Sequence, residues 1–251
     1  MSNTATVLAF DFGASSGRAI RAVYDGQNLT YEEIHRFENI PIEKEGHLCW
    51  DVETLLKEIH TAIQKAGTFD SLGFDTWGVD FGLLDADGHL LANPVHYRDA
   101  RTNGKPEQAA ARMPAEELYA HTGNQIMAIN TLFQLLALRE QDPELLQKAA
   151  QILFMPDLFA ALLGAEPVCE RSIASTSQML DPRTGQWSRE VLTAYGLKEN
   201  HFAPLVASGT VTGTLANGAK IIAVAGHDTQ CASAAMPCAE EDAEHTAFIS
   251  C

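Results

Sequence analysis

The sequence is constrained most by a polar, glycine-containing stretch that lies between two apolar runs near its start. The stretch is Asp11-Phe12-Gly13-Ala14-Ser15-Ser16-Gly17-Arg18, and the apolar runs cover residues 5–10 and 19–24. Short apolar runs separated by glycines are typical of strands joined by a tight turn, so the pattern predicts a β-hairpin with the polar stretch at its tip. We expect Gly13 and Gly17 to permit backbone conformations that other residues resist.

Two interpretations of this hairpin tip are open. Successive backbone N–H groups can form a concave anion site, and Ser15, Ser16 and Arg18 add donors suited to phosphate oxygens. Asp11 is suited to hold a hydrated Mg²⁺. The alternative is an ordinary hairpin turn, because short glycine-containing motifs often occur without a ligand.

Charge and composition exclude several classes of function. The 251 residues carry a net charge of −16, which argues against nucleic acid or an anionic membrane as the main partner, because both need a basic surface. The five cysteines are odd in number and scattered, which is typical of free thiols in a reducing compartment. The start has no basic signal segment, and no apolar run is long enough to cross a membrane. These features predict a cytoplasmic protein.

The remaining pattern predicts a mixed sheet with helices on its faces. Further strands are expected at 29–37, 71–76, 79–84 and 221–225, and a helix is expected from Asp51 to Gly67. The middle of the chain is predicted to be helical, at 105–113, 115–121, 131–139 with Asn130 as its cap, after 142–143, at 156–163 and at 188–195. The apolar run 246–251 is predicted to begin one more strand, so we expect the chain to be the first half of a longer protein.

Three more polar clusters lie at predicted strand ends or loop starts. They are Asp75-Thr76-Trp77-Gly78-Val79-Asp80-Phe81, His96-Tyr97-Arg98-Asp99-Ala100-Arg101-Thr102 and Gly226-His227-Asp228-Thr229. In doubly wound sheets, ligands bind outside the carboxyl ends of the strands. We therefore expect these clusters to contribute to one site.

Each cluster also has a purely structural interpretation. Trp77 is suited to stack on a sugar beside Gly78, or else it is a core residue of a hairpin. The stretch 96–102 is rich in hydrogen-bonding groups, or else it is a solvated loop with a local Arg–Asp pair. Asp228 is suited to accept a proton from a hydroxyl group, or else it caps a helix. Taken with the Asp11 stretch, the clusters favour phosphoryl transfer to an alcohol, which needs positioning, charge stabilisation and a base.

Blocks along the whole chain resemble one known family. The blocks are Asp11–Arg18, Glu33–Phe37, Trp50–Val52, Gly73–Phe81, Tyr97–Thr102, Asn130–Leu135, Met155–Asp157 and Gly226–Thr229. In this order they resemble the N-terminal domain of the FGGY carbohydrate kinases, in the actin/hexokinase/Hsp70 superfamily. The resemblance implies an α/β, ribonuclease-H-like domain in which helices flank a mixed five-stranded sheet and further helices are inserted.

The resemblance also implies a domain division. Residues 1–245 are expected to form the sugar-binding N-terminal domain, and 246–251 the first strand of a C-terminal nucleotide-binding domain that this chain lacks. The adenosine pocket and a second phosphate loop would belong to that domain. We therefore expect the 251 residues alone to have little or no activity.

The resemblance implies ATP and Mg²⁺ as cofactors and a ketose as substrate. Asp228 is the implied catalytic base, and Asp11 the implied Mg²⁺ ligand through water. The ATP phosphates are expected to face Ala14, Ser15, Ser16, Gly17 and Arg18. The sugar is expected to contact Gly78, His227, Asp228 and Thr229, with Trp77 and Asp80 as further candidates. His227 is alternatively a residue that orients Asp228.

The reaction that the resemblance implies is phosphorylation of the 1-hydroxyl of L-rhamnulose. A kinase for another ketose, such as fuculose or xylulose, is the nearest alternative. A non-catalytic sugar-binding module and an actin-like ATPase without a sugar substrate are the others. The Trp77–Asp80 segment and Asp228 argue against the ATPase.

Overall fold

The Asp11 stretch joins the first two strands of the protein, as the hairpin pattern predicts. The computed structural model describes residues 4–247 and 249. Strand β1 (Ala5–Phe12) pairs antiparallel with β2 (Ser16–Tyr24), which pairs antiparallel with β3 (Leu29–Glu38). The turn itself is therefore only residues 13–15, and Asp11 lies opposite Arg18 inside the ladder.

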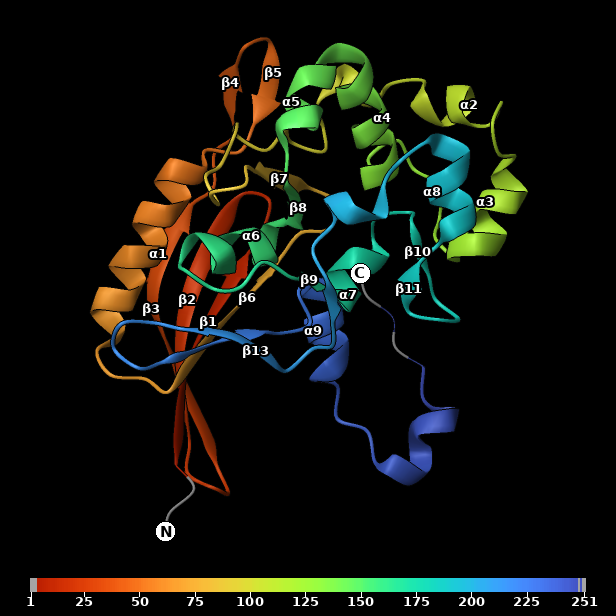
Figure 1. Cartoon of the computed structure of the whole chain (residues 1–251). Helices are drawn as coiled ribbons and strands as arrows, with labels where there is room; N and C mark the ends of the chain where they lie inside the picture. The colour runs from red at the N-terminus through yellow and green to blue at the C-terminus, as the bar shows by residue number, and fades with distance from the viewer. Residues whose placement is uncertain (1–3, 248, 250–251) are drawn as a thin grey trace.

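These strands belong to a six-stranded mixed sheet in the order β13-β14-β6-β1-β2-β3 (Figure 1). Strand β6 (Ser71–Thr76) is parallel to β1, and β14 (Lys220–Ala223) is parallel to β6. Strand β13 (Thr210–Thr214) adds antiparallel to β14 at the edge. The mixed sheet is confirmed, and β13 is one strand more than the five predicted. Its threonine- and glycine-rich sequence lacks the apolar pattern by which a strand is recognised.

Helices α1 (Val52–Ala66) and α6 (Met155–Leu162) cover one face of this sheet (Figure 1). The Asp51 side chain accepts the amide N–H of Thr54 at the start of α1, and Gly67 ends the helix with a φ of 66°. Both ends agree with the prediction, because an aspartate N-cap and a glycine with positive φ are strong helix boundaries.

The aromatic side chains of β1 and β6 form the core beneath these helices. The Phe10 ring stacks on Phe74 with a centroid distance of 4.9 Å, and the Phe12 ring stacks on Phe159 of α6 at 4.7 Å. Successive side chains of a strand point to opposite faces. Asp11, which lies between Phe10 and Phe12, therefore points to the face that α1 and α6 leave open.

The helical middle of the chain lies beside the sheet and is accompanied by short strand pairs (Figure 1). The helices are α2 (Lys105–Ala109), α3 (Ala115–Thr122), α4 (Thr131–Gln141), α5 (Pro143–Lys148), α7 (Arg171–Ser175) and α8 (Arg189–Tyr195). Helix α9 (Asp228–Ala234) follows β14. The strand pairs are β4 (Ile42–Lys44) with β5 (His47–Cys49), β7 (Phe81–Leu84) with β8 (Gln151–Phe154), β9 (Cys169–Glu170) with β12 (Leu205–Val206), and β10 (Leu180–Asp181) with β11 (Gln186–Trp187). Three 3₁₀ helices are described: η1 (Ala100–Thr102), η2 (Glu199–His201) and η3 (Glu240–His245).

Four predicted features differ in the structure. The helix expected at 105–113 ends at Ala109. The strand expected at 79–84 begins only at Phe81 and pairs with β8 outside the main sheet. Asn130 occupies the N-cap position of α4, but its side chain accepts the amide N–H of Met127 instead of capping the helix. The strand expected at 246–251 includes 248, 250 and 251, which lie outside the described residues, and its other residues belong to no helix or strand.

Gly17 is required by packing and not by backbone conformation. Neither Gly13 nor Gly17 has a positive φ, so the expectation of an unusual backbone at these glycines was wrong. A Cβ atom at Gly17 would lie 2.3 Å from Cζ of Phe37, which faces it across β2 and β3. The absent side chain leaves room for that ring.

We expect Gly17→Ala to destabilise the protein by about 1–3 kcal/mol, because overpacking forces side chains out of their rotamers. Chemical denaturation of the two proteins measures the difference. Phe37→Leu in the same background serves as the control, since a smaller side chain opposite position 17 relieves the clash. Equal penalties for Gly17→Ala with and without Phe37→Leu would contradict this explanation.

Candidate active site

Three of the four predicted clusters meet at one edge of the main sheet. Asp11 and Asp75 are register partners at the carboxyl ends of the parallel strands β1 and β6. The amide N–H of Thr76 donates to the carbonyl of Gly226 at 2.9 Å, and Thr76 forms a parallel bridge with His227. The Asp11–Arg18 stretch, the Asp75–Phe81 segment and the Asp228 turn are thereby brought together, as expected for the carboxyl edge of an α/β sheet.

The Asp11–Arg18 stretch, called the Asp11 turn below, has hydrogen-bond donors at this edge without partners among the residues that the structure describes. Asp11 Oδ2 accepts a hydrogen bond from Arg18 Nε at 2.8 Å, so the two side chains are paired with each other. The Gly13 N–H donates to the Ser16 carbonyl at 2.9 Å, and the Asn39 N–H donates to the Ser15 carbonyl at 3.0 Å. Within residues 4–247 and 249, the amide N–H groups of 14 and 15 and the hydroxyls of 15 and 16 have no partner. These donors suit phosphate oxygens.

Asp75 adds a third carboxylate between Asp11 and Asp228. Burial, together with the charges of Asp11 and Asp228, raises the pKa of Asp75 to about 7 against the opposing effect of Arg18. Carboxylate oxygens are the ligands that Mg²⁺ prefers, and these carboxylates would meet a hydrated Mg²⁺ through its water molecules. Sequence reasoning assigned Asp75 no role, although its place at the end of β6 was visible.

Asp228 begins helix α9 and is held on one of its two oxygens. Its Oδ1 accepts the amide N–H and the hydroxyl of Thr229 and lies 3.0 Å from His227 Nδ1. The hydrogen bond with His227 lowers the pKa of Asp228 below its ordinary value, and the contacts with Thr229 lower it too. In the part of the chain that the structure describes, Oδ2 has no partner. The residue is therefore an ionised carboxylate with one oxygen available.

The N-cap position of α9 belongs to His227 and not to Asp228. His227 Nδ1 lies 3.1 Å from the amide nitrogen of Thr229, but an Nδ1 that donates to Asp228 Oδ1 cannot also accept this N–H, which Asp228 Oδ1 accepts at 2.5 Å. The helix-cap interpretation of Asp228 is thus only partly met, because Asp228 already occupies the first helical position.

The Trp77–Asp80 segment lies largely inside the protein. Trp77 is 6% exposed, and its ring lies 3.9 Å from that of Trp50 between centroids. Asp80 is 1% exposed. Its Oδ2 accepts Trp50 Nε1 at 2.6 Å, Trp77 Nε1 at 3.0 Å and the Tyr97 N–H at 3.1 Å. Both residues therefore support the wall of the site from behind, and neither presents its side chain openly to a ligand.

The third predicted cluster is joined to this network. Tyr97 bonds to Asp80 through its backbone, and the Asp99 side chain accepts the amide N–H groups of Leu48 and Arg101. Burial lowers the pKa of His96 to about 4. The stretch 96–102 is thus tied to the core at the buried His96 and Thr102, whereas Arg98 and Ala100 are exposed, and it is not a wholly solvated loop.

Two residues near the site were missed by sequence reasoning. Gln134 Nε2 donates to Asp80 Oδ1 at 2.8 Å. Gln134 belongs to the block Asn130–Leu135, which resembles the FGGY family, but the sequence pattern assigned no role to this side chain. Glu170, which is 1% exposed, accepts the amide N–H of Gly226 at 3.1 Å and so fixes the turn before Asp228. No sequence pattern distinguished this glutamate.

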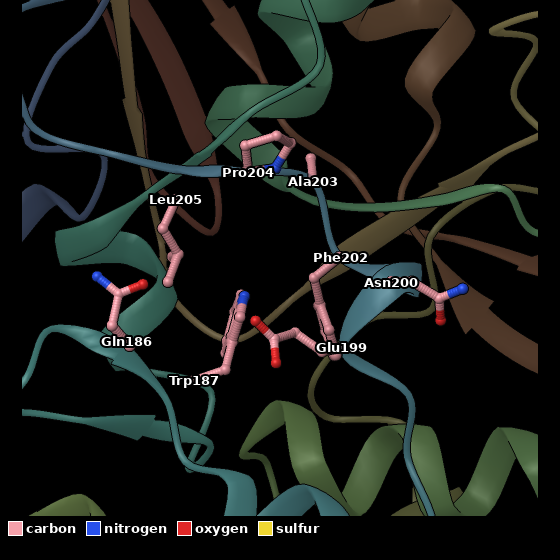
Figure 2. A pocket seen from close by; sticks show the side chains of 8 residues that line it. All are labelled: Gln186, Trp187, Glu199, Asn200, Phe202, Ala203, Pro204 and Leu205. Carbon is pink, nitrogen blue, oxygen red and sulfur yellow. The ribbon is translucent and has the colours of Figure 1, made fainter.

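A separate pocket of about 480 Å³ lies away from this edge. Figure 2 shows its lining, which is Gln186, Trp187, Glu199, Asn200, Phe202, Ala203, Pro204 and Leu205. None of the predicted site residues lines it. The pocket size alone therefore does not locate the candidate active site, whereas the convergence of strand ends does.

Comparison with known proteins decides the family. Residues 6–234 match the model of the N-terminal domain of the FGGY family of carbohydrate kinases. The chain belongs to this family. A rhamnulokinase from Bacteroides thetaiotaomicron is 41% identical over 243 residues, which are 92% of this chain and 50% of that protein. The chain thus spans about half the length of this FGGY kinase.

Solved structures show the same fold. A xylulose kinase from Lactobacillus acidophilus is similar with a TM-score of 0.74 and 18% identity over 87% of this chain and 47% of that one. A gluconate kinase from the same organism has a TM-score of 0.76 and 17% identity over 88% of this chain and 48% of that one. The predicted sugar-kinase fold is confirmed.

None of the helices in the described ranges has both the length and the apolar character needed to span a membrane.

Proposed function

We propose that this protein transfers the γ-phosphoryl group of ATP to the 1-hydroxyl of L-rhamnulose, giving L-rhamnulose 1-phosphate. The observation that carries the proposal is the 41% identity with a rhamnulokinase over 92% of the chain. The convergence of Asp11, Asp75 and Asp228 at one sheet edge supports a phosphoryl transfer at that place. The free thiols of Cys49, Cys169, Cys231 and Cys238 support the proposed cytoplasmic location.

Asp228 is the proposed base. Its Oδ2 accepts the proton of the sugar 1-hydroxyl while the hydroxyl oxygen forms its bond to the γ-phosphorus and the bond to the β,γ-bridging oxygen breaks. His227 and Thr229 hold Oδ1, so the carboxylate cannot turn away from the sugar. The lowered pKa keeps the group ionised at neutral pH, where it orients the hydroxyl for an in-line attack.

The unsatisfied donors of the Asp11 turn are the proposed phosphate contacts. The N–H groups of Ala14 and Ser15, the hydroxyls of Ser15 and Ser16, the Gly17 backbone and the Arg18 guanidinium would face the ATP phosphates. Asp11 would hold Mg²⁺ through water, and the metal would supply charge neutralisation at the phosphates. Gly78, His227, Asp228 and Thr229 would line the sugar site, with Trp77 and Asp80 behind it.

We also propose that residues 1–245 are the sugar-binding domain and that 246–251 lead into a second, nucleotide-binding domain. The family relatives are about twice as long as this chain, which supports that division. Two-domain closure that excludes water would then complete the site. The 251-residue chain alone is expected to bind the sugar without appreciable ATP turnover.

Calorimetric titration of the 251-residue chain with L-rhamnulose, L-fuculose and D-xylulose tests the substrate. We expect saturable binding that is tightest for L-rhamnulose. A coupled kinase assay of the full-length protein on the same sugars then separates an enzyme from a binding module. Preference for another ketose would correct the substrate, and sugar binding without phosphorylation by the full-length protein would favour the binding module.

A further inference from the structure

The backbone at Val79 is in a conformation that valine rarely adopts. Its φ is 69°, and the amide N–H of Asp80 donates to the carbonyl of Gly78 at 2.9 Å across it. A hydrogen bond from residue i+2 to residue i with a positive central φ is a γ-turn of the rare, strained kind. A β-branched residue in this region is an outlier that persists only where its surroundings enforce it.

Three side chains enforce this turn. The hydroxyl oxygen of Thr176 accepts the Val79 N–H at 3.0 Å, and the hydroxyl of Thr131 donates to the Val79 carbonyl at 2.6 Å. Gln134 Nε2 reaches the same carbonyl at 3.4 Å and also holds Asp80. Thr131 and Gln134 belong to α4, and Thr176 directly follows α7 (Figure 1). The peptide groups before and after Val79 are therefore held from two helical segments outside the main sheet.

The turn packs directly against the turn that carries Asp228. A Cβ atom at Gly78 would lie 2.8 Å from Cδ2 of His227 and 3.0 Å from Cγ2 of Thr176. The backbone of Gly78 therefore packs directly against the His227 imidazole, whose Nδ1 lies 3.0 Å from Asp228 Oδ1. A change in the Val79 conformation would move Gly78 relative to this imidazole.

We propose that Thr131, Gln134 and Thr176 are positioning residues that hold Val79 in its strained turn and thereby set the distance between Gly78 and His227 for the sugar. The inference rests on the proposed function, because it takes Gly78 and His227 as part of the sugar site. All three side chains come from the helical middle of the chain, which thereby has a part in the sugar site. We call these three side chains the clamp. The clamp is necessary because the strained turn at Val79 would relax without it.

Isosteric variants test the clamp in the 251-residue chain. The double variant Thr131→Val and Thr176→Val removes both hydroxyls and keeps the shape of each side chain. We expect its Kd for L-rhamnulose to rise by about tenfold or more, because small displacements of positioning groups have large effects. The matching Thr→Ser pair keeps both hydroxyls and is expected to bind like the unmodified chain. Thr212→Val, at a buried threonine of β13, is the control for the substitution itself.

Val79→Gly in the Thr131→Val and Thr176→Val background separates positioning from general stability. Glycine adopts positive φ without strain, so we expect it to restore most of the affinity for L-rhamnulose. A merely structural role of the two hydroxyls would leave affinity unrestored by glycine. If the double variant does not fold, the Kd values of the single variants Thr176→Val and Thr176→Ser for L-rhamnulose are compared instead, by the same calorimetric titration.

The possible failures are distinguishable. If the unmodified chain does not bind L-rhamnulose or any other ketose, the proposed function fails. If it binds and the double variant binds equally well, only the clamp is overturned. If the double variant is weakened and Val79→Gly does not restore binding, the three residues stabilise the fold and do not position Gly78.

Discussion

Replacing Asp228 by Asn is expected to lower kcat for L-rhamnulose phosphorylation in the full-length protein by about 10²–10⁴-fold. Asparagine has the same shape, and its side-chain oxygen can still accept the hydrogen bonds of Thr229 that hold Oδ1 in place. Its amide group cannot take the proton that the free Oδ2 is proposed to accept. Sugar affinity, measured by calorimetry, is therefore expected to change far less than kcat.

The pH dependence of the rate gives a second readout for Asp228. Its pKa is lowered from the ordinary value of 3.8, chiefly by the hydrogen bond with His227. A base acts only above its own pKa, so this carboxylate is ionised throughout the neutral range. We expect it to produce no fall in kcat between about pH 8 and pH 5.

Asp25→Asn is the matched control for Asp228→Asn, since it makes the same substitution in the exposed turn between β2 and β3. This variant is expected to retain full activity. Retention of more than about a tenth of the activity by Asp228→Asn would remove Asp228 as the base, because base catalysis contributes at least about 10²-fold.

Local sequence patterns were sufficient for the elements that place the site. The apolar run before Asp11 and the run 71–76, which contains Asp75, were predicted as strands, and both are. The rule that ligands meet carboxyl strand ends then placed Asp11, the 75–81 segment and Asp228 together before any contact was known. Their meeting follows from β1, β6 and β14 being parallel neighbours.

The support behind the site was not predictable from local patterns. Asp80 gathers hydrogen bonds from Trp50, Tyr97 and Gln134, which lie 30, 17 and 54 residues away in the chain. Only the tertiary fold brings them together, and a lone Trp–Gly–Val–Asp segment carries no sign of its partners. For this reason the sequence left Trp77 open between a sugar wall and a core residue, and the structure places it against Trp50 with 3.9 Å between the ring centroids.

Gly17 and Val79 show the same difference between what local sequence patterns predict and what tertiary contacts decide. Gly17 was assigned to backbone freedom because glycine often serves that purpose, whereas its packing partner Phe37 is 20 residues away and across a strand pair. The strained turn at Val79 was unforeseen because valine normally favours strands, and local preference predicted one there. Tertiary hydrogen bonds from Thr131 and Thr176 override that preference.

Replacing Asp80 by Ala is expected to destabilise the protein by at least about 4 kcal/mol, because each buried donor left without a partner costs about 1–3 kcal/mol. Four donors lose their acceptor together: the indole N–H groups of Trp50 and Trp77, the Tyr97 amide and the Gln134 side-chain amide. That loss is a large share of the ~5–15 kcal/mol by which domains are stable. Denaturation in guanidinium chloride measures it.

Two further variants separate buried hydrogen bonding from the loss of an aspartate. Asp80→Asn retains one oxygen for the three donors at Oδ2, and its amide group meets Gln134 Nε2, so we expect a smaller cost of about 1–2 kcal/mol. Gln134 cannot turn its amide to compensate, because its Nε2 also donates to Ile129 and its Oε1 accepts Arg101. Asp85→Ala removes an exposed carboxylate that accepts the N–H groups of Asp87 and His89. Water replaces that acceptor, so the expected cost is about 1 kcal/mol or less.

The dependence of stability on pH tests whether the buried Asp80 carboxyl group causes the loss of stability in these variants. Burial raises its pKa from 3.8 to about 6 against the lowering effect of its hydrogen bonds. The folded protein therefore holds a proton that the unfolded chain has released between about pH 4 and pH 6, and this contribution to stability falls as pH rises through that window. In both Asp80 variants, we expect the free energy of unfolding no longer to show this fall between about pH 4 and pH 6. In Asp85→Ala the fall is expected to remain. An Asp80→Ala variant that is no less stable than Asp85→Ala, and whose slope is unchanged, would show that the four donors find other partners.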